Sequence, residues 1–355
     1  MTVLRCEHNP IVKTSDVKPS RPDFKVLGAF NAGVARYGDE TILLLRVAEA
    51  PISEHEDEVL IPKLDQLTGT VVVERLSAHD ERYDYSDSRF VAENGRMVML
   101  TSMSHLRIAR SKDGIHFSIE EKPAIFPETE LEAWGIEDPR ITQIGDKYYI
   151  TYSAASIRGV GVGLAETSDF VTFKRHGIML APENKDVMLF PEIINGKYYT
   201  LTRPVPHSFG APEMWIAESA DLVHWGNHRF LMGLRKGSWD GGRMGGGAVP
   251  IRTEKGWLAL YHGADTKHRY CMGAVLLDLE DPGKVLARST RPFMEPEAEY
   301  EVNGFFGGVV FSCGALLVGD TVRMYYGAAD EVMAVADIPL SDIFDTLSYD
   351  EDQLI

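Results

Sequence analysis

The residues best suited to chemistry stand where short segments rich in β-branched and aromatic residues begin or end. Asp138 lies near the start of one such segment, and Arg203 and His262 each lie at the end of another. A carboxyl group can donate a proton to a leaving atom, and cationic groups can hold an anion. Asp138 could instead begin a turn, and Arg203 and His262 could be ion-paired, so their function depends on whether the fold brings them together.

A repeated pair of strands carries these residues. Each copy has a short strand, a turn that contains glycine, and a second strand rich in aromatic and β-branched residues, as in RITQIGDKYYITYS (140–153) and ALLVGDTVRMYYG (315–327). The dipeptides NG and GD between apolar runs are strong signals for a β-hairpin. The turn glycines recur every 50 to 63 residues and are Gly38, Gly95, Gly145, Gly196, Gly256 and Gly319.

A hairpin with this spacing predicts an all-β fold of the β-propeller type, in which each blade has four strands. A second motif supports the outer half of each blade. The segments 106–117, 162–173 and 214–225 predict two strands joined by a Ser-Asp turn and closed by an aromatic residue. A β-sandwich is the alternative, but sandwiches rarely repeat one hairpin with its own sequence signature. Counting hairpins alone leaves five or six blades open.

The repeat also predicts which residues face the axis, because the innermost strand of each blade lines the central channel. The start of the first strand gives Asn31, Asp87, Asp138, Glu192, Gly247 and Gly308, and the end of the second gives Arg46, Ser102, Ser153, Arg203 and His262. Such polar and charged positions favour a central-channel site for a polar ligand, and carbohydrate is the natural candidate. Aromatic faces for stacking a sugar are available at Trp134, Trp239, Phe209 and Tyr300.

The composition limits the partners of the chain. Its 355 residues carry a net charge of −17, which argues against nucleic acid and anionic membranes as partners. Three cysteines without metal-type spacing predict reduced, structural thiols. The first residues contain no apolar signal-peptide core, and no run approaches the ~20 apolar residues of a membrane span, so a cytoplasmic protein is expected.

Two segments have features of ligand sites without meeting their requirements. The acidic run EHED (54–57) contains metal-ligating residue types, but a solvated loop explains it, and no metal or organic cofactor is expected. The glycine-rich run GGRMGGG (241–247) lacks the GK[ST] ending of a P-loop. We expect this run to let the backbone approach a ligand closely.

Motifs spread in order through the chain, from about Asn31 to Ile343, give it a family resemblance. They are GIEDPRI (135–141), KDVMLFPEIINGKYY (185–199), LTRP (201–204), GWLALYHGAD (256–265) and MYYGAAD (324–330). With these motifs the sequence resembles glycoside hydrolase family 130, which contains mannoside phosphorylases and β-1,2-mannosidases on a five-bladed β-propeller. The resemblance implies five blades in a single catalytic domain over residues 1–355. Residues 336–355 then form a C-terminal tail. Segment 48–86, with the hairpin at 87–102, is an elaboration near the first blade, and 48–86 is expected to shape acceptor choice.

The resemblance also implies roles for individual residues. Asp138 matches the family's catalytic aspartate, which protonates the glycosidic oxygen through the 3-hydroxyl group of the mannosyl unit. The sugar-binding positions that carry over are Asn31, Arg46 and Asp330, and the phosphate-binding positions are Lys185, Arg203, Arg243 and His262. The hydrolytic branch has acidic residues where these four are basic. Further candidates for substrate contacts are Asp87, Arg89 and Glu192.

These residues favour phosphorolysis over hydrolysis. Hydrolysis with inversion needs a carboxylate base to activate water, whereas phosphate is already an anionic nucleophile and needs cations to hold it. We therefore expect an inverting phosphorylase that cleaves β-mannosides with inorganic phosphate to give α-mannose 1-phosphate. The expected substrate is β-1,2-mannobiose or short β-1,2-mannan. A β-1,2-mannosidase with Glu192 as its base and a non-catalytic carbohydrate-binding propeller remain as alternatives. The leaving-group sugar and the oligomeric state, a homo-oligomer included, stay open.

Overall fold

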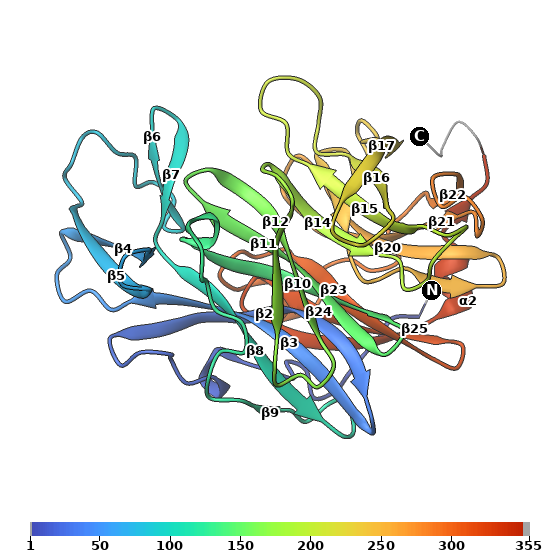
Figure 1. Ribbon diagram of the computed structural model, residues 1–355, viewed down its shortest axis with the longest axis horizontal. Coiled ribbons are helices and arrows are strands. Elements are labelled where there is room, and N and C mark those ends of the chain that lie inside the picture. The colour runs from blue at the N-terminus through green and yellow to red at the C-terminus, as the bar shows by residue number, and fades with distance from the viewer. Residues whose placement is uncertain (1, 351–355) are drawn as a thin grey trace.

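The computed structural model describes residues 2–350, and within them the strands form five consecutive antiparallel blades (Figure 1). The first two blades share one sheet through a parallel bridge between Gly135 and Ser104. The first consists of β2 (Phe24–Tyr37), β3 (Glu40–Pro51), β8 (Met103–Ser111) and β9 (Ser118–Ile119), and the second of β10 (Gly135–Ile144), β11 (Lys147–Ser156), β12 (Gly159–Thr167) and β13 (Lys174–Leu180).

The other three blades complete the ring. The third consists of β14 (Asn184–Leu189), β15 (Tyr198–Pro204), β16 (Met214–Ser219) and β17 (Trp225–Met232). The fourth consists of β18 (Arg243–Gly246), β19 (Ile251–Thr253), β20 (Gly256–Ala264), β21 (Tyr270–Leu277), β22 (Val285–Ser289) and β26 (Leu347–Ser348). The fifth consists of β23 (Val310–Val318), β24 (Thr321–Ala328), β25 (Val332–Pro339) and, from the N-terminal end of the chain, β1 (Leu4–Arg5). Leu4 lies opposite Asp337 of β25, so the first strand in sequence is the outermost strand of the last blade.

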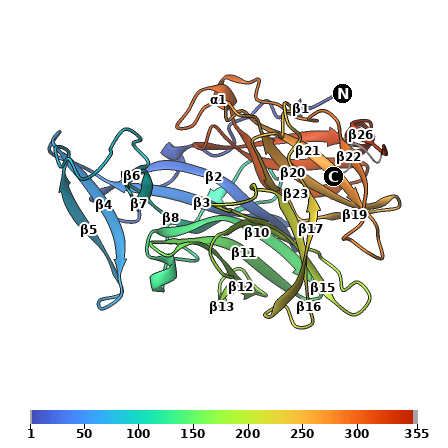
Figure 2. The ribbon, with the colours of Figure 1, turned by 90° about the horizontal axis from the view of Figure 1, so that it is seen from above.

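Two further hairpins lie between β3 and β8. They are β4 (Glu58–Asp65) with β5 (Thr70–Ser77), and β6 (Phe90–Glu93) with β7 (Arg96–Leu100), and each pair is a separate two-stranded sheet. Figure 1 and Figure 2 both show them at one end of the molecule, outside the blades. We call residues 52–102 the insertion.

Helical segments in residues 2–350 are short. They are the 3₁₀ helices η1 (Thr14–Asp16) and η2 (Glu130–Glu132) and the α-helices α1 (Glu299–Val302) and α2 (Leu340–Phe344). Helix α2 lies in the predicted C-terminal tail, whose last residues, 351–355, are outside the described residues. None of the helices in the described part of the chain has the length and apolar character needed to cross a membrane.

The hairpins predicted for 140–153 and 315–327 are confirmed. Segment 140–153 forms β10 and β11, with Ile144 opposite Lys147, and segment 315–327 forms β23 and β24. The turn glycines Gly145 and Gly319 have φ of 64° and 59°. A Cβ atom at either position would meet nothing within 4 Å. Glycine is therefore favoured there by the left-handed backbone conformation rather than by a lack of space.

The predicted Ser-Asp turns are also present, between the third and fourth strands of the first three blades. In each turn one carboxylate oxygen of the aspartate accepts hydrogen bonds from the backbone N–H groups two and three residues later. The aspartates are Asp113, Asp169 and Asp221. Such Asx turns replace backbone hydrogen bonds that the strands can no longer make, which explains the recurrence of aspartate at this position.

Three blades of the described chain share a buried contact that we call the carboxylate clamp. A carboxylate on the segment leading into the blade accepts hydrogen bonds from a tyrosine of the second strand and from an arginine two strands further out. The members are Glu132, Tyr152 and Arg175 in the second blade, Asp240, Tyr261 and Arg288 in the fourth, and Glu301, Tyr326 and Arg5 in the fifth. The clamp ties two strands of a blade to the chain that precedes it.

The clamp of the fifth blade gives a testable stability prediction. Tyr326→Phe removes a hydroxyl group that lies 2.7 Å from a Glu301 carboxylate oxygen in the interior. A buried charge that loses one donor costs about 1–3 kcal/mol, so we expect the free energy of unfolding to fall by that amount in urea titrations. The exposed Tyr349 provides the control, and Tyr349→Phe should unfold like the wild type. Equal stability of the two variants would contradict the prediction.

Candidate active site

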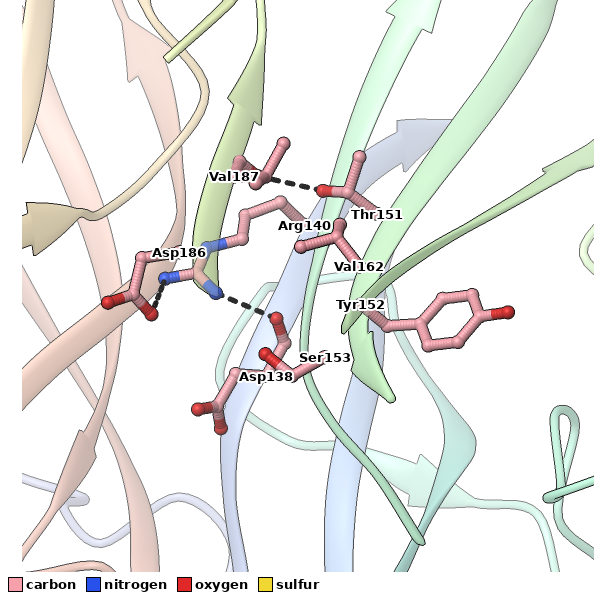
Figure 3. Close-up of a pocket in the computed structure, with 8 residues that line it drawn as sticks. All are labelled: Asp138, Arg140, Thr151, Tyr152, Ser153, Val162, Asp186 and Val187. Carbon is pink, nitrogen blue, oxygen red and sulfur yellow. Dashed lines mark hydrogen bonds and ion pairs between the residues drawn. The ribbon is translucent and has the colours of Figure 1, made fainter. Parts of the chain in front are cut away.

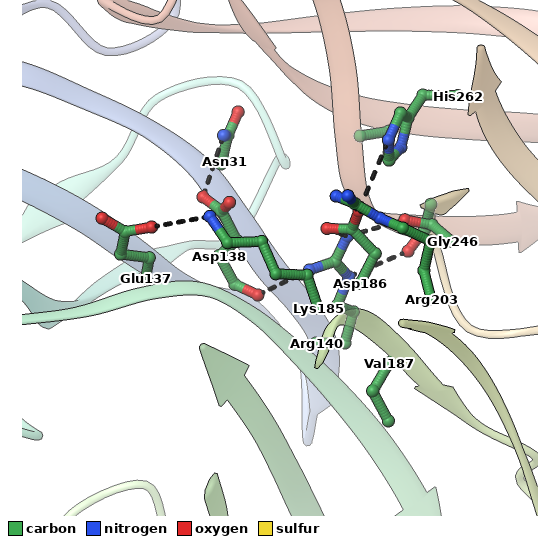
Figure 4. A network of polar contacts seen from close by, with 12 residues as sticks. Asn31, Glu137, Asp138, Arg140, Lys185, Asp186, Val187, Arg203, Gly246 and His262 are labelled. Carbon is green, nitrogen blue, oxygen red and sulfur yellow. Dashed lines mark hydrogen bonds and ion pairs between the residues drawn. The ribbon is translucent and has the colours of Figure 1, made fainter. Parts of the chain in front are cut away.

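The innermost strands of the first three blades each contain an irregularity at the same place. Asn31, Asp138 and Asp186 have φ of 48°, 49° and 55°, and in each case the pairing with the second strand shifts register there. Aspartate and asparagine tolerate the left-handed conformation better than most residues, and a bulge redirects a side chain out of the regular sheet pattern. Figure 4 shows the three side chains close together.

The predicted register is therefore right for Asn31 and Asp138, but wrong for Glu192 and for Asp87, which lies in the insertion outside the blades. Asp186, six residues before Glu192, holds the position equivalent to Asp138. Glu192 lies beyond the end of β14, where one of its carboxylate oxygens is 2.7 Å from Arg252 Nη1 and about half of each side chain is exposed. The structure does not bring Glu192 to the cluster around Asp138.

The residues predicted at the end of the second strand have equivalent positions in four blades. In the first three blades these residues lie on the second strand, opposite the residue before the register shift, and in the fourth His262 lies opposite Gly245 in a regular pairing. They are Arg46, Ser153, Arg203 and His262. Ser102, predicted with them, lies in the insertion outside the blades.

Asp138 is held by groups from the first blade. Its Oδ1 atom accepts hydrogen bonds from Asn31 Nδ2 at 2.9 Å and from Arg46 Nη1 at 3.0 Å. Burial opposes the charge of Asp138, but the cationic side chains of Arg46, Arg140 and Lys185 outweigh that effect and hold its pKa below the usual range. In the free protein Asp138 is therefore ionised at neutral pH.

Asp186 is the centre of a second buried group. Arg203 Nη2 lies 2.6 Å from Asp186 Oδ2, and Arg140 Nη2 lies 3.3 Å from Oδ1. His262 Nε2 is 3.5 Å from Oδ2. Burial lowers the pKa of His262 to about 3 despite the carboxylate of Asp186, so the imidazole is neutral near pH 7. His262 can therefore offer an anion a hydrogen bond, but not a full charge.

The glycine-rich run lets these buried groups approach the backbone. Arg140 Nη2 donates to the carbonyl oxygen of Gly246 at 2.6 Å, and its Nε donates to that of Gly247 at 3.2 Å. A Cβ atom at Gly245 would lie 2.3 Å from Asp186 Oδ2. The close approach predicted for a ligand is thus made by the side chains of Asp186 and Arg140.

The remaining basic candidates lie around the same groups. Lys185 Nζ is 3.6 Å from Glu137 Oε2, and Glu137 also accepts a hydrogen bond from Arg46 at 2.9 Å. Arg243 Nη1 donates to the hydroxyl group of Tyr270 at 3.1 Å. Both lysine and arginine are partly exposed, unlike the buried Arg140 and Arg203.

The pKa of Asp330 is raised, whereas that of Asp138 is lowered. Burial is the main reason that its pKa rises to about 6, and the nearby charge of Asp138 raises it further against the effect of Arg46 and Arg89. Asp330 can therefore carry a proton in weakly acidic solution. Arg89 is itself paired with Asp87 through two hydrogen bonds, and no hydrogen bond from either residue to the cluster is seen.

A pocket of about 140 Å³ lies beside Asp138, between the second and third blades (Figure 3). Asp138, Arg140 and Asp186 contribute to its walls. This space is too narrow to enclose even a water-sized sphere, so it cannot hold a sugar ring. A sugar would have to reach Asp138 from the channel instead.

The candidate aromatic faces are dispersed. Trp239 stacks on Tyr261 and fills the space left by two glycines inside the fourth blade. Tyr300 bonds to Asn9 near the N-terminal segment, and Phe209 is exposed on the loop between β15 and β16. Trp239 therefore has a packing role, whereas Trp134 directly precedes β10, the strand that carries Asp138.

Sequence reasoning missed four residues of the site. Glu137 and Arg140 stand in the same EDPR motif as Asp138, and Asp186 stands in KDVMLF. These three could have been found from their charge, because each stands within two residues of a residue that was already predicted to belong to the site. Tyr270, which lies near both Arg243 and His262, gave no signal of its own.

Comparisons with known proteins identify the family. A family model of glycoside hydrolase family 130, described as β-1,4-mannooligosaccharide phosphorylase, matches residues 85–349. The chain belongs to glycoside hydrolase family 130. This family 130 chain is 50% identical over 353 residues to the β-1,2-mannobiose phosphorylase of Listeria innocua, covering 99% of each. It is 43% identical over 244 residues to the 1,2-β-oligomannan phosphorylase of a Thermoanaerobacter species, covering 68% of this chain and 80% of that one.

A solved structure supports the same assignment. The Listeria innocua enzyme in complex with β-1,2-mannobiose matches this family 130 structure with a TM-score of 0.96 at 51% identity, covering 98% of this chain and 99% of that chain. The predicted resemblance and the five-bladed propeller are thereby confirmed.

Proposed function

We propose that this family 130 protein is an inverting phosphorylase that cleaves β-1,2-mannobiose or short β-1,2-mannan with inorganic phosphate, releasing α-mannose 1-phosphate. The observation that carries the proposal is the arrangement of Lys185, Arg203, Arg243 and His262 around the axis, beside Asp138. The names of the two similar relatives support the β-1,2 linkage, whereas the family description names a β-1,4 linkage.

In this proposal Asp138 supplies the proton for the leaving oxygen. The bond between the anomeric carbon and the glycosidic oxygen breaks, and that oxygen takes a proton that Asp138 delivers through the 3-hydroxyl group of the mannosyl unit. A phosphate oxygen forms the new bond from the opposite face, which inverts the configuration to α. Asn31, Arg46 and Asp330 hold the mannosyl unit.

Phosphate itself would prepare Asp138 for this role. Arg46, Arg140 and Lys185 hold the pKa of Asp138 low in the free protein. A phosphate anion bound between the cations adds negative charge next to Asp138 and offsets their effect, which raises the pKa of the carboxyl group. The acid would then be protonated mainly when the nucleophile is in place.

The position of Glu192 supports phosphorolysis over hydrolysis. The hydrolytic alternative needs a carboxylate base near the anomeric carbon, and Glu192 was the candidate for it. Its carboxylate is paired with Arg252 on an exposed part of the third and fourth blades. A residue in that place has no access to water held beside Asp138.

The proposal predicts that turnover depends on phosphate and on Arg243. Pure protein incubated with β-1,2-mannobiose should form mannose 1-phosphate when inorganic phosphate is present and little product without it. Arg243→Ala should raise the KM for phosphate by about 10- to 100-fold, since each charge-assisted hydrogen bond is worth roughly 1.5–3 kcal/mol. The KM for mannobiose should change little, and Arg252→Ala serves as a control away from the site. Free mannose formed at equal rates with and without phosphate would show a hydrolase instead.

A further inference from the structure

The insertion meets the fifth blade at one contact beside the site. The guanidinium group of Arg89 is held by the Asp87 carboxylate, with Nε 2.9 Å from Oδ1 and 3.2 Å from Oδ2, and Nη2 2.6 Å from Oδ2. This fork fixes the plane of the guanidinium group. Arg89 Cζ then lies over the ring of Phe306, 4.7 Å from its centroid. A planar cation on an aromatic face is a favourable pairing even where it is partly exposed.

The other half of the contact belongs to the loop between α1 and β23. The backbone N–H of Phe306 donates to the carbonyl oxygen of Ala329 at 2.9 Å, directly before Asp330. The Phe306 ring lies 6.4 Å from the ring of Tyr270, whose hydroxyl accepts a hydrogen bond from Arg243. Phe306 is thus placed next to both the proposed sugar-binding and phosphate-binding groups.

Arg89 also interacts electrostatically with Asp330 and Tyr270. The positive charge of Arg89 acts on Asp330 and lowers the pKa that burial raises. Asp330 and Tyr270 in turn help to raise the pKa of Arg89. Arg89 keeps 39% of its side chain exposed, and Phe306 is half-buried, so the contact lies on the outer side of the cluster rather than within the core.

We propose that Arg89 and Phe306 form a bridge over the mouth of the site that restricts the length of the oligosaccharide. The inference rests on the proposed function. A mannosyl unit bound at Asp138 and Asp330 leaves the rest of its chain to run outward, past these two side chains. A disaccharide ends close to the bridge, whereas each further mannose unit has to displace it. The bridge therefore makes longer chains poorer substrates than mannobiose.

Chain-length preference tests the bridge. We expect Arg89→Ala and Phe306→Ala each to raise the ratio of kcat/KM for β-1,2-mannotriose and mannotetraose to that for mannobiose by about threefold to tenfold, measured at saturating phosphate. Arg89→Lys, which keeps the charge but loses the fork and the planar contact, should also raise the ratio. A double variant should give no more than the larger single effect, because both changes open the same contact.

The insertion offers a matched control. Arg82 pairs with Asp80 through the same two-residue spacing and the same fork, at 3.0 and 2.6 Å, and lies 5.1 Å over Tyr83. Arg82 is exposed, and the ring beneath it belongs to the insertion rather than to the fifth blade. Arg82→Ala should therefore leave the ratio at the wild-type value.

Two results would overturn the bridge. One is an unchanged ratio in both alanine variants with wild-type melting temperatures. The other is a change in Arg89→Ala without one in Phe306→Ala, which would make Arg89 a sugar contact. Calorimetric Kd values for mannobiose and mannotetraose, measured in an Asp138→Asn background with and without Phe306→Ala, test the same ratio without turnover. Absence of phosphate-dependent cleavage by the wild type would count against the proposed function, while its presence with unchanged ratios would count against the bridge alone.

Discussion

Replacing Asp138 by asparagine is expected to lower kcat with mannobiose and phosphate by about 10²- to 10⁴-fold, the usual effect of losing a positioned acid. The amide is close in size to the carboxyl group, and its oxygen can still accept hydrogen bonds from Asn31 and Arg46. The fold should therefore persist while the proton is lost. Initial rates of mannose 1-phosphate formation, together with circular dichroism, measure the two effects separately.

The same hairpin provides the control for this experiment. Asp146 lies in the exposed turn between β10 and β11, at the opposite end of the strand that carries Asp138. Asp146→Asn changes the same functional group and should keep the wild-type rate. A kcat for Asp138→Asn that stays close to the wild-type value would remove Asp138 from the role of acid.

Asp186→Asn should have the largest effect on stability. Its carboxylate lies between the buried guanidinium groups of Arg140 and Arg203, and removing one partner of a buried charge group typically costs about 3–5 kcal/mol. These cations hold the pKa of Asp186 far below 3.8, although burial alone would raise it. A carboxyl group with a lowered pKa stabilises the folded state fully above its unfolded pKa. The difference in unfolding free energy between wild type and variant should therefore be full above about pH 5 and shrink as the pH falls below 4.

Phosphate should partly restore this variant, because an anion bound by Arg203 replaces some of the lost negative charge. We expect phosphate to raise the melting temperature of Asp186→Asn more than that of the wild type. Asp240→Asn is the matched control, since Asp240 is a buried carboxylate between Arg235 and Arg288, inside the fourth blade. It should be destabilised without gaining from phosphate. Equal responses of the two variants to phosphate would refute a link between Asp186 and the anion site.

The hairpins were predictable because their turns depend on local chemistry, but the number of blades was not. The segment around Gly95 carries the same signature as an inner hairpin, yet it forms β6 and β7 outside the blades. Local sequence specifies that two strands pair with each other. It does not specify which sheet they join, since that depends on contacts with distant segments.

The prediction of the axis-facing residue was wrong in the third blade for a geometric reason. Asp138 lies seven residues before the turn glycine Gly145, but Asp186 lies ten residues before Gly196, because extra residues separate β14 from its turn. The prediction stopped at Glu192, four residues before Gly196, and so fell six residues short of Asp186. The turn and the site are at opposite ends of the inner strand, so any change in length between them shifts the prediction.

The place of β1 in the last blade has a consequence for how the protein is made. Arg5 can reach its partner Glu301, and Leu4 its partner Asp337, only after nearly the whole polypeptide has left the ribosome. Strand β1 has no partner strand until β25 has been synthesised, after the strands of the first four blades other than β26. Closure of the ring by β1 and β25 is then a late event, and a fusion that restrains residues 2–5 should slow maturation without altering any residue near Asp138.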